Sequence, residues 1–309
     1  MRTRIGGGDG DEALDALKTV RDWIRWTNSR LEDADLYFGH GTDEAWDEAV
    51  ALVGGALRIP RDRLEPMLSA RVTRAEGVIL LGLLERRIEA RVPVPYLVGR
   101  AWLAGVEFVV DERVIVPRSP IAGLLDEGLA PWLVTEPLRI LDLCTGSGCL
   151  GLLAALAYPD AEVVLADLSA DALEVAQTNV ERLGLSDRVT LRQGDGPAAL
   201  GPEVPFDLVI CNPPYVNASD LATMPEEFAS EPAMALAGGE DGLALISAWL
   251  PVLPAHMTDG AVLVLELGNS APALGVRFPE LSVSWPALET GGTGVLVITA
   301  EDLRTLTAG

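Results

Sequence analysis

The chain has 309 residues, 49% of them hydrophobic, which suits two globular domains because single hydrophobic cores usually stop growing near roughly 250 residues. Its apolar runs are too short to cross a bilayer and its N-terminus lacks a secretory pattern, so we expect a cytoplasmic protein with no membrane partner. A net charge of −23 with a single lysine, Lys18, argues against stable binding to nucleic-acid phosphates, and leaves a basic protein partner or a salty cytoplasm to explain the acidity.

The cysteines and histidines predict neither a metal site nor a disulfide framework. Cys144, Cys149 and Cys211 give an odd count and no paired Cys-x-x-Cys with histidines nearby. The two histidines, His40 and His256, are far apart in the sequence. We therefore expect small buried thiols and no bound metal.

The first third of the chain is expected to be helical. Residues 1–10 are rich in glycine and predict a flexible tip, whereas apolar residues recur at helical spacing through residues 11–98. Thr73 and Glu76 stand three residues apart ahead of an apolar run, which is the pattern of a capping box. These signals predict a small helical domain.

Residues 99–120 predict a connecting β-hairpin, because apolar residues cluster at 106–110 and 114–116 on either side of the polar turn 111–113. From residue 121 onward, strands and helices alternate, which indicates a parallel, doubly wound α/β sheet with an antiparallel final pair. The strands are predicted at residues 139–143, 162–166, 189–192, 207–211, 261–267, 281–285 and 295–299, and the main helices at 150–158, 172–183 and 243–253.

A glycine-bearing turn follows the first of these strands. Residues 142–149 read Asp-Leu-Cys-Thr-Gly-Ser-Gly-Cys, which joins a buried strand to a helix and lets the backbone approach a ligand closely. The turn lacks the spacing of a dinucleotide fingerprint and has no Gly-Lys pair, so neither a dinucleotide nor a P-loop phosphate fits it. The alternative explanation is tight packing of strand against helix without a ligand.

Acidic residues follow the next two strands. Asp167 ends the second strand, where its carboxylate could accept hydrogen bonds from ribose hydroxyls. A helix cap is the alternative, but Ser169 is already placed to cap the following helix. Asp195, which precedes Gly196, could accept a hydrogen bond from an adenine amino group, although a simple turn explains it almost as well. We therefore expect a nucleoside-containing cofactor.

The most specific motif is the tetrapeptide Asn212, Pro213, Pro214 and Tyr215, directly after the strand at 207–211. A planar NH2 group has two donors, so it needs two acceptors if its nitrogen is to face an electrophile. The side-chain carbonyl of Asn212 and the main-chain carbonyl of Pro213 can be those acceptors, and Tyr215 can stack on the planar group. This chemistry predicts methyl transfer from S-adenosylmethionine to an amide or amine nitrogen, mainly by positioning. The alternative is an ordinary Asn-Pro turn.

Residues 20–309 resemble the HemK-like protein-glutamine methyltransferases, most closely their PrmB type. The stretches at 37–49 and 109–120 carry this resemblance together with the Asn-Pro-Pro-Tyr motif. It implies an α/β fold, with a seven-stranded Rossmann-like class I methyltransferase domain at 121–309 preceded by a helical substrate-recognition domain. It also implies methylation of a glutamine in a large-subunit ribosomal protein, the third in the usual numbering, as substrate and partner.

The resemblance also implies roles for individual residues. The residues expected to bind the cofactor S-adenosyl-L-methionine are Asp142, Cys144, Thr145, Gly146, Ser147, Gly148, Asp167, Leu168, Asp195, Gly196 and Asn212. The whole tetrapeptide is expected to be catalytic, with Asn212, Pro213 and Tyr215 holding the substrate glutamine. Arg118 and Glu231 are expected to help bind the substrate. The alternative for Arg118 is to organise the loop beside the active site, and Glu231 could equally begin a plain loop.

The chain departs from the family pattern at Gly196 and Pro197, where these enzymes usually have an aromatic or large apolar residue, which leaves open how adenine is packed. Three other functions remain: a release-factor glutamine methyltransferase, an adenine-amino DNA methyltransferase and a noncatalytic ribosome-assembly factor. The acidity and the lack of a basic recognition domain count against DNA, and the intact Asn212 counts against a noncatalytic role.

Overall fold

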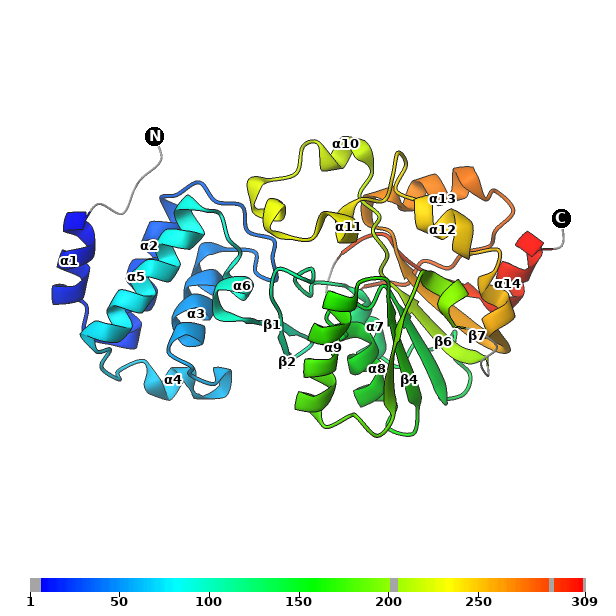
Figure 1. Cartoon of the computed structure of the whole chain (residues 1–309), viewed down its shortest axis with the longest axis horizontal. Coiled ribbons are helices and arrows are strands. Elements are labelled where there is room, and N and C mark those ends of the chain that lie inside the picture. The colour runs from blue at the N-terminus through cyan, green and yellow to red at the C-terminus, as the bar shows by residue number, and fades with distance from the viewer. Residues whose placement is uncertain (1–6, 201–204, 289–291, 308–309) are drawn as a thin grey trace. The chain divides into compact units, whose positions relative to one another are not determined.

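The computed structural model describes residues 7–200, 205–288 and 292–307, and the chain divides into two compact units. Of the described residues, the first unit contains 7–101, 110–112 and 225–230, and the second contains the rest. Figure 1 shows the elements of both units and labels many of them. In the described part of the chain, no helix is long and apolar enough to cross a membrane.

The first unit is helical, as predicted. Of the predicted flexible tip, residues 1–6 lie outside the described residues, and Gly7–Gly10 form the start of α1. The helices of this unit are α1 (Gly7–Ala16), α2 (Val20–Glu32), α3 (Ala45–Ala56), α4 (Leu64–Met67), α5 (Arg74–Glu89) and α6 (Val94–Val98).

Helix starts and apolar faces explain this arrangement. The predicted capping box is confirmed at the start of α5, where the Glu76 backbone N–H donates to Thr73 Oγ1 and the Thr73 backbone N–H donates to the Glu76 carboxylate. The helices bury one shared core that includes Trp23, Leu52 and Leu84. Burial of a large apolar side chain stabilises a fold by about 1.5–3 kcal/mol, so this core supports the unit.

A buried ion-pair network ties a distant segment into this core. The side chain of Arg87 is 0% exposed, and its Nε and Nη2 donate to the two carboxylate oxygens of Glu48 at 2.7 and 3.1 Å. Glu227, in the short helix η3 (Glu226–Ser230), accepts from Arg91 Nη1 at 3.1 Å and from the backbone N–H of Tyr37 at 3.0 Å. Arg87 Nη1 lies 3.5 Å from the same carboxylate. Residues 225–230 therefore belong to the helical unit although they come late in the sequence.

The second unit is built on a sheet of six strands in the order β5-β4-β3-β6-β7-β8, in which only β8 runs antiparallel to its neighbour. This order confirms the predicted α/β class. The strands are β3 (Arg139–Leu143), β4 (Glu162–Asp167), β5 (Val189–Gln193), β6 (Phe206–Cys211), β7 (Met257–Glu266) and β8 (Val295–Thr299).

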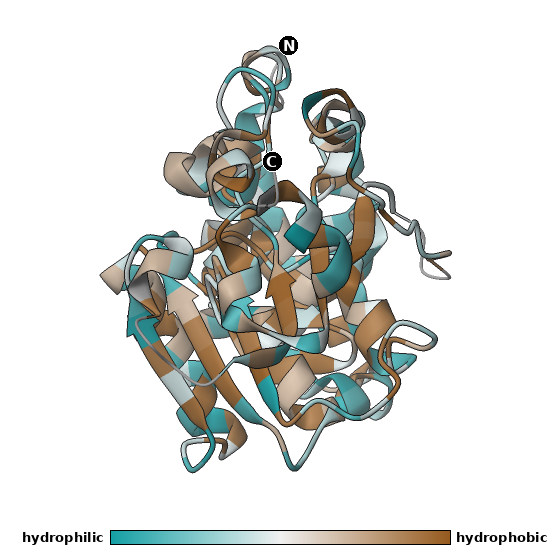
Figure 2. Ribbon diagram, turned by 90° about the vertical axis from the view of Figure 1, so that its right-hand side faces the viewer, coloured by the Kyte–Doolittle hydropathy of each residue, from teal (hydrophilic) through white to brown (hydrophobic). Residues whose placement is uncertain are grey.

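Helices cover both faces of the sheet, because alternate strand residues point to opposite sides. Ile140 belongs to a cluster that contains apolar residues of α7 (Ile121–Asp126), α8 (Cys149–Ala157) and α9 (Ala170–Leu183). Leu141 belongs to the other cluster, which contains apolar residues of α12 (Ala244–Trp249), α13 (Ala271–Arg277) and α14 (Ala300–Arg304). In Figure 2, several strands of the sheet are coloured mainly as hydrophobic residues.

The seventh strand, predicted at 281–285, is reduced to one antiparallel bridge in which Ser284 and Val297 exchange two backbone hydrogen bonds of 2.9 Å. In an antiparallel ladder the next residue positioned to donate after Ser284 would be Pro286, which has no N–H. The predicted antiparallel direction of this pair is correct, but its length is not.

The predicted hairpin register is wrong. The two short strands are β1 (Arg100–Leu103) and β2 (Val106–Val109), so the turn lies at Ala104 and Gly105 and not at 111–113. Both turn residues have positive φ, 46° and 77°, which suits a tight hairpin turn. Residues 114–116 form no strand. Val114 and Val116 are instead buried within irregular structure, which accounts for the apolar pattern there.

Removing the buried guanidinium should destabilise the first unit. We expect Arg87→Ala to lower the free energy of unfolding of this unit by about 3–5 kcal/mol, because Glu48 and Glu227 would be left as buried carboxylates without their central partner. Urea unfolding followed by tryptophan fluorescence measures this change. Arg74→Ala is the matched control, since Arg74 pairs with Asp15 at the surface and should contribute less than about 0.5 kcal/mol. Equal effects of the two substitutions would contradict the assigned role of Arg87.

Candidate functional site

Strand register brings the sequence motifs to one edge of the sheet. Leu143 pairs with Ala166 and with Cys211, and Cys211 pairs with Leu265, so β4, β3, β6 and β7 share one row of residues. These four strands run parallel, and the next residue of each therefore emerges at the same edge. Those residues are Cys144, Asp167, Asn212 and Glu266.

The glycine turn after β3 is held together by a buried acid. Asp142 Oδ2 accepts from Thr145 Oγ1 at 2.5 Å and from the backbone N–H of Gly151 at 2.9 Å. Gly151 must lack a side chain, because an added Cβ would come within 2.2 Å of Leu165 and 2.9 Å of the Asp142 Cβ. Burial raises the pKa of Asp142 to about 7. Asp142 and Thr145 thus shape the turn from inside the protein.

Asp167 stands at the end of β4 and fixes the turn from the other side. Its Oδ2 accepts from the backbone N–H of Gly146, and its Oδ1 accepts from the backbone N–H of Ser169, both at 2.9 Å. Ser169 caps α9, as predicted, since its Oγ accepts from the Ala172 N–H. Each carboxylate oxygen has further acceptor capacity, so the side chain can still accept hydrogen bonds from a ligand.

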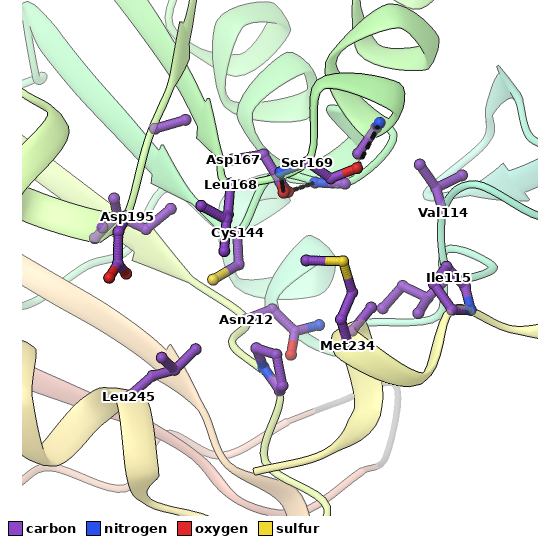
Figure 3. A pocket seen from close by; sticks show the side chains of 18 of the residues that line it. Val114, Ile115, Cys144, Asp167, Leu168, Ser169, Asp195, Asn212, Met234 and Leu245 are labelled. Carbon is purple, nitrogen blue, oxygen red and sulfur yellow. Dashed lines mark hydrogen bonds between the residues drawn. The ribbon is translucent and has the colours of Figure 1, made fainter.

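A cavity of about 110 Å³ opens beside these groups, entirely within the second unit. Asn212 and Cys144 border it, with Asp195 and Leu245 at one end and Val114 and Ile115 at the other (Figure 3). The predicted site residues that line it are Cys144, Gly146, Asp167, Leu168, Asp195, Gly196, Asn212 and Pro214. The predicted site residues that do not line it are Asp142, Thr145, Ser147, Gly148, Pro213, Tyr215, Arg118 and Glu231.

Several lining residues have no local sequence signal. Ile115 comes from the segment mistaken for a strand, Met234 from α11 (Ala233–Leu236), and Leu245 and Trp249 from α12. Nothing in their own neighbourhoods distinguishes them from ordinary apolar residues, because only the tertiary fold brings them to the cavity. In the described part of the chain, no group of three or more His, Cys, Asp or Glu residues could hold a metal ion.

The Asn212 side-chain amide is open to the cavity. It lines the wall between Cys144 and Met234 in the view of Figure 3. Among residues 7–200, 205–288 and 292–307, none forms a side-chain hydrogen bond with it, in contrast to Asn179 and Asn217, whose amides bond to the protein. Its donor and acceptor thus remain available to a ligand.

Tyr215 is held outside the cavity wall. Its hydroxyl donates to Glu266 Oε1 at 2.9 Å, and its backbone carbonyl accepts from Ser270 Oγ at 2.7 Å. Ser119 Oγ donates to the other oxygen of Glu266. Burial raises the pKa of both Glu266 and Tyr215. The end of the tetrapeptide is therefore anchored to the carboxyl end of β7.

Arg118 and Glu231 form a pair that organises the neighbouring loop. The Glu231 carboxylate, buried with 0% of its side chain exposed, accepts from Arg118 Nη2 at 2.7 Å and from the Val116 backbone N–H at 2.9 Å. Arg118 Nη1 also donates to it and to the Val116 carbonyl. The side chains of Arg118 and Glu231 are thus both bound to protein groups of this loop.

Comparison with known proteins agrees with this geometry. Residues 126–246 match the family model described as "Methyltransferase small domain". The chain is similar to the ribosomal protein uL3 glutamine methyltransferase of Bordetella pertussis, with 50% identity over 94% of this chain and 97% of that protein. The protein of the same name from Burkholderia pseudomallei is 46% identical over 93% of this chain and 96% of its own length.

Among solved structures, the similarity is weaker. The Thermus thermophilus 16S rRNA N2 G1207 methyltransferase has a TM-score of 0.44 and 23% identity, and the match covers 65% of this chain and 49% of that chain.

The raised pKa of Asp142 predicts a specific pH dependence of stability. Because the folded carboxyl ionises near pH 7 and the unfolded one near 3.8, the folded state holds the extra proton between these values. The stabilisation from this group is complete below about pH 4 and is lost as the pH rises to about 7, by up to roughly 4 kcal/mol.

Asp142→Asn removes this titration. The stability of the variant relative to the native protein should increase steadily from pH 4.5 to pH 7.5, as measured by urea unfolding at each pH. A difference between the two proteins that does not change with pH would show that Asp142 titrates normally.

Proposed function

Because the chain belongs to the family of the ribosomal protein uL3 glutamine methyltransferases, we propose that it transfers a methyl group from S-adenosylmethionine to the side-chain amide nitrogen of a glutamine in uL3. The observation that carries this proposal is the Asn212 amide, which lines the cavity near the glycine turn and Asp167 and has no side-chain hydrogen bond to any of the described residues. An unpaired amide at a ligand cavity is suited to recognise another amide.

The groups around the cavity fit S-adenosylmethionine. Asp167 offers acceptors for ribose hydroxyls, and Asp195 offers an acceptor for the adenine amino group. The backbone of Gly146 can approach the methionine part, because no side chain intervenes there. The cofactor supplies an electrophilic methyl group on a sulfonium, so the protein has to position the nucleophile and requires no metal.

The glutamine NH2 group would donate one hydrogen bond to the side-chain carbonyl of Asn212 and the other to the main-chain carbonyl of Pro213. These two hydrogen bonds would orient the amide nitrogen and increase its electron density, which favours methyl transfer. The nitrogen would form a bond to the methyl carbon as the bond from that carbon to the sulfonium sulfur breaks, which leaves S-adenosylhomocysteine, and the amide would lose one N–H proton to solvent. Tyr215 would support this arrangement from behind, because its hydroxyl and its carbonyl are fixed by Glu266 and Ser270. Pro214 restricts the backbone between them.

The substrate protein would be recognised by a part of the chain other than the residues that hold the reacting amide. We assign this role to the helical residues 11–98, since the second unit already holds the cofactor groups and the tetrapeptide. A net charge of −23 complements a basic ribosomal protein and disfavours nucleic acid. Release factor and DNA are therefore comparison substrates in the test.

The direct test is to incubate the protein with methyl-labelled S-adenosylmethionine and, in separate reactions, uL3, release factor and duplex DNA. Label on a glutamine of uL3, located by mass spectrometry of its peptides, is the expected result. Label on release factor alone would overturn the proposed substrate, and absence of label in all three reactions would overturn the proposed activity.

Asn212→Ala should abolish most of the transfer while leaving cofactor affinity within about threefold, because it removes an acceptor used for the reacting amide. Loss of one positioned polar group of this kind typically costs about 10²–10³ in kcat. Single-turnover methylation and calorimetry with S-adenosylmethionine measure the two effects separately.

Asn217→Ala is the matched control for this substitution. Asn217 caps α10 (Ala218–Leu221) five residues further along the same loop and does not line the cavity. It should retain near-native transfer. If Asn212→Ala were as active as Asn217→Ala, the proposed positioning of the amide would be incorrect.

A further inference from the structure

The backbone of Gly196 lies directly against an indole ring. Gly196 follows Asp195 at the start of the short helix η2 (Gly196–Ala199) and has a positive φ of 54°. A Cβ added there would lie 2.2 Å from Cε2 and 2.6 Å from Nε1 of Trp249. Real Cβ atoms do not approach other atoms so closely, so position 196 can hold no side chain while Trp249 keeps its place.

Trp249 comes from a different part of the chain. It lies on α12 four residues after Leu245, so the two side chains share one face of the helix, and both line the cavity. Trp249 is only 9% exposed and packs in the same core cluster as Leu141 and Leu250. The indole is therefore held firmly at the cavity wall.

These residues lie at the end of the cavity that contains Asp195. In the view of Figure 3, Asp195 and Leu245 both lie on the left of the cavity, whereas Val114 and Ile115 lie on the right. Asp195 offers a carboxylate acceptor there, and Leu245 with Trp249 offers an apolar wall of which one part is aromatic. A planar ring with an exocyclic amino group matches this combination of acceptor and aromatic surface.

We infer that Trp249 packs against the purine ring of the cofactor and takes the place of a side chain at position 196. This inference rests on the proposed use of S-adenosylmethionine. A side chain at position 196, directly after Asp195, could in principle contact the purine, but here α12 supplies that contact through Trp249. Position 196 is a glycine because the indole occupies the space that a side chain would need. Gly196 and Trp249 thus form one size-complementary pair at the wall of the cavity.

The test measures cofactor binding by calorimetry, independently of methyl transfer. Trp249→Ala should weaken binding of S-adenosylmethionine by about 5- to 150-fold, the range that base contacts with aromatic side chains usually provide. Trp249→Phe should retain most of the affinity. Trp285→Ala is the control, because Trp285 is 55% exposed and does not line the cavity, and it should bind as the native protein does.

Binding of ligands that contain only part of the cofactor shows which part of the cofactor Trp249 contacts. S-adenosylhomocysteine and 5′-methylthioadenosine both contain the purine, and the second lacks the amino-acid portion. The loss caused by Trp249→Ala should be similar for all three ligands. A loss for S-adenosylmethionine with unchanged binding of 5′-methylthioadenosine would place the indole at another part of the cofactor and overturn the inference.

A double-mutant cycle tests the pair itself. Gly196→Ala should weaken binding in the native background, because the new Cβ displaces the indole, and should weaken it several-fold less in the Trp249→Ala background. Backbone strain at the positive φ occurs in both backgrounds and therefore cancels in the comparison. Equal effects of Gly196→Ala in the two backgrounds would overturn the proposed pairing.

Folding is checked by circular dichroism for each variant, and Trp249→Leu replaces Trp249→Ala if the alanine variant is unfolded. Leucine fills core volume without an aromatic face, so it should also weaken binding by at least about fivefold. Native affinity in a folded leucine or alanine variant would show that Trp249 has only a packing role. If the native protein bound no S-adenosylmethionine, the proposed function itself would fail, which separates the two outcomes.

Discussion

The whole site depends on the in-register parallel pairing of β4, β3, β6 and β7. Because these four strands run parallel and in register, they all end at the same edge of the sheet. The residues that directly follow their paired last positions therefore lie together at that edge. This constraint brings Cys144, Asp167 and Asn212 to one cavity from sites up to 68 residues apart in the sequence. A slip of one residue in any strand would turn its side chains to the opposite face.

The buried acidic side chains around this edge accept hydrogen bonds from other protein groups. This distinguishes them from the side chains that remain available to bind a ligand. Asp142 accepts from the glycine turn, Glu266 from Tyr215 and Ser119, and Glu231 from Arg118. These acids keep the turn, the tetrapeptide and the neighbouring loop in place. The amide of Asn212 has no such bond among the described residues, and the chemistry is therefore expected there.

The loop after the tetrapeptide links the two units covalently. Between Tyr215 and Glu231 the chain contributes residues 225–230 to the helical unit, where Glu227 is bound by Arg87 and Arg91, and then returns to the second unit. The segment that begins at the proposed catalytic residues thus also forms part of the core of the proposed recognition domain. No period or motif in the sequence signals this exchange, because it depends on an ion pair between residues 140 positions apart.

The sequence alone determined the structural elements that depend on interactions between residues close together in the chain. The capping box of Thr73 and Glu76, the strand 139–143 and the glycine turn after it follow from side-chain period, capping and turn chemistry within a few residues. The position of Asn212 at the sheet edge follows in the same way from the apolar strand before it. The resemblance to glutamine methyltransferases also depended on such local motifs.

Only the tertiary structure decided the features that depend on backbone conformation or on contacts between residues far apart in the sequence. Ala104 and Gly105 set the hairpin turn because their backbone can adopt positive φ, whereas the polar residues 111–113 only looked like a turn. The space beside Gly196 is occupied by Trp249, 53 positions away, and a glycine cannot indicate from its own neighbourhood which side chain occupies the space above it. The sequence thus specified the residues of the glycine turn and the tetrapeptide, and only the packing of α12 against the sheet specified the wall that completes their cavity.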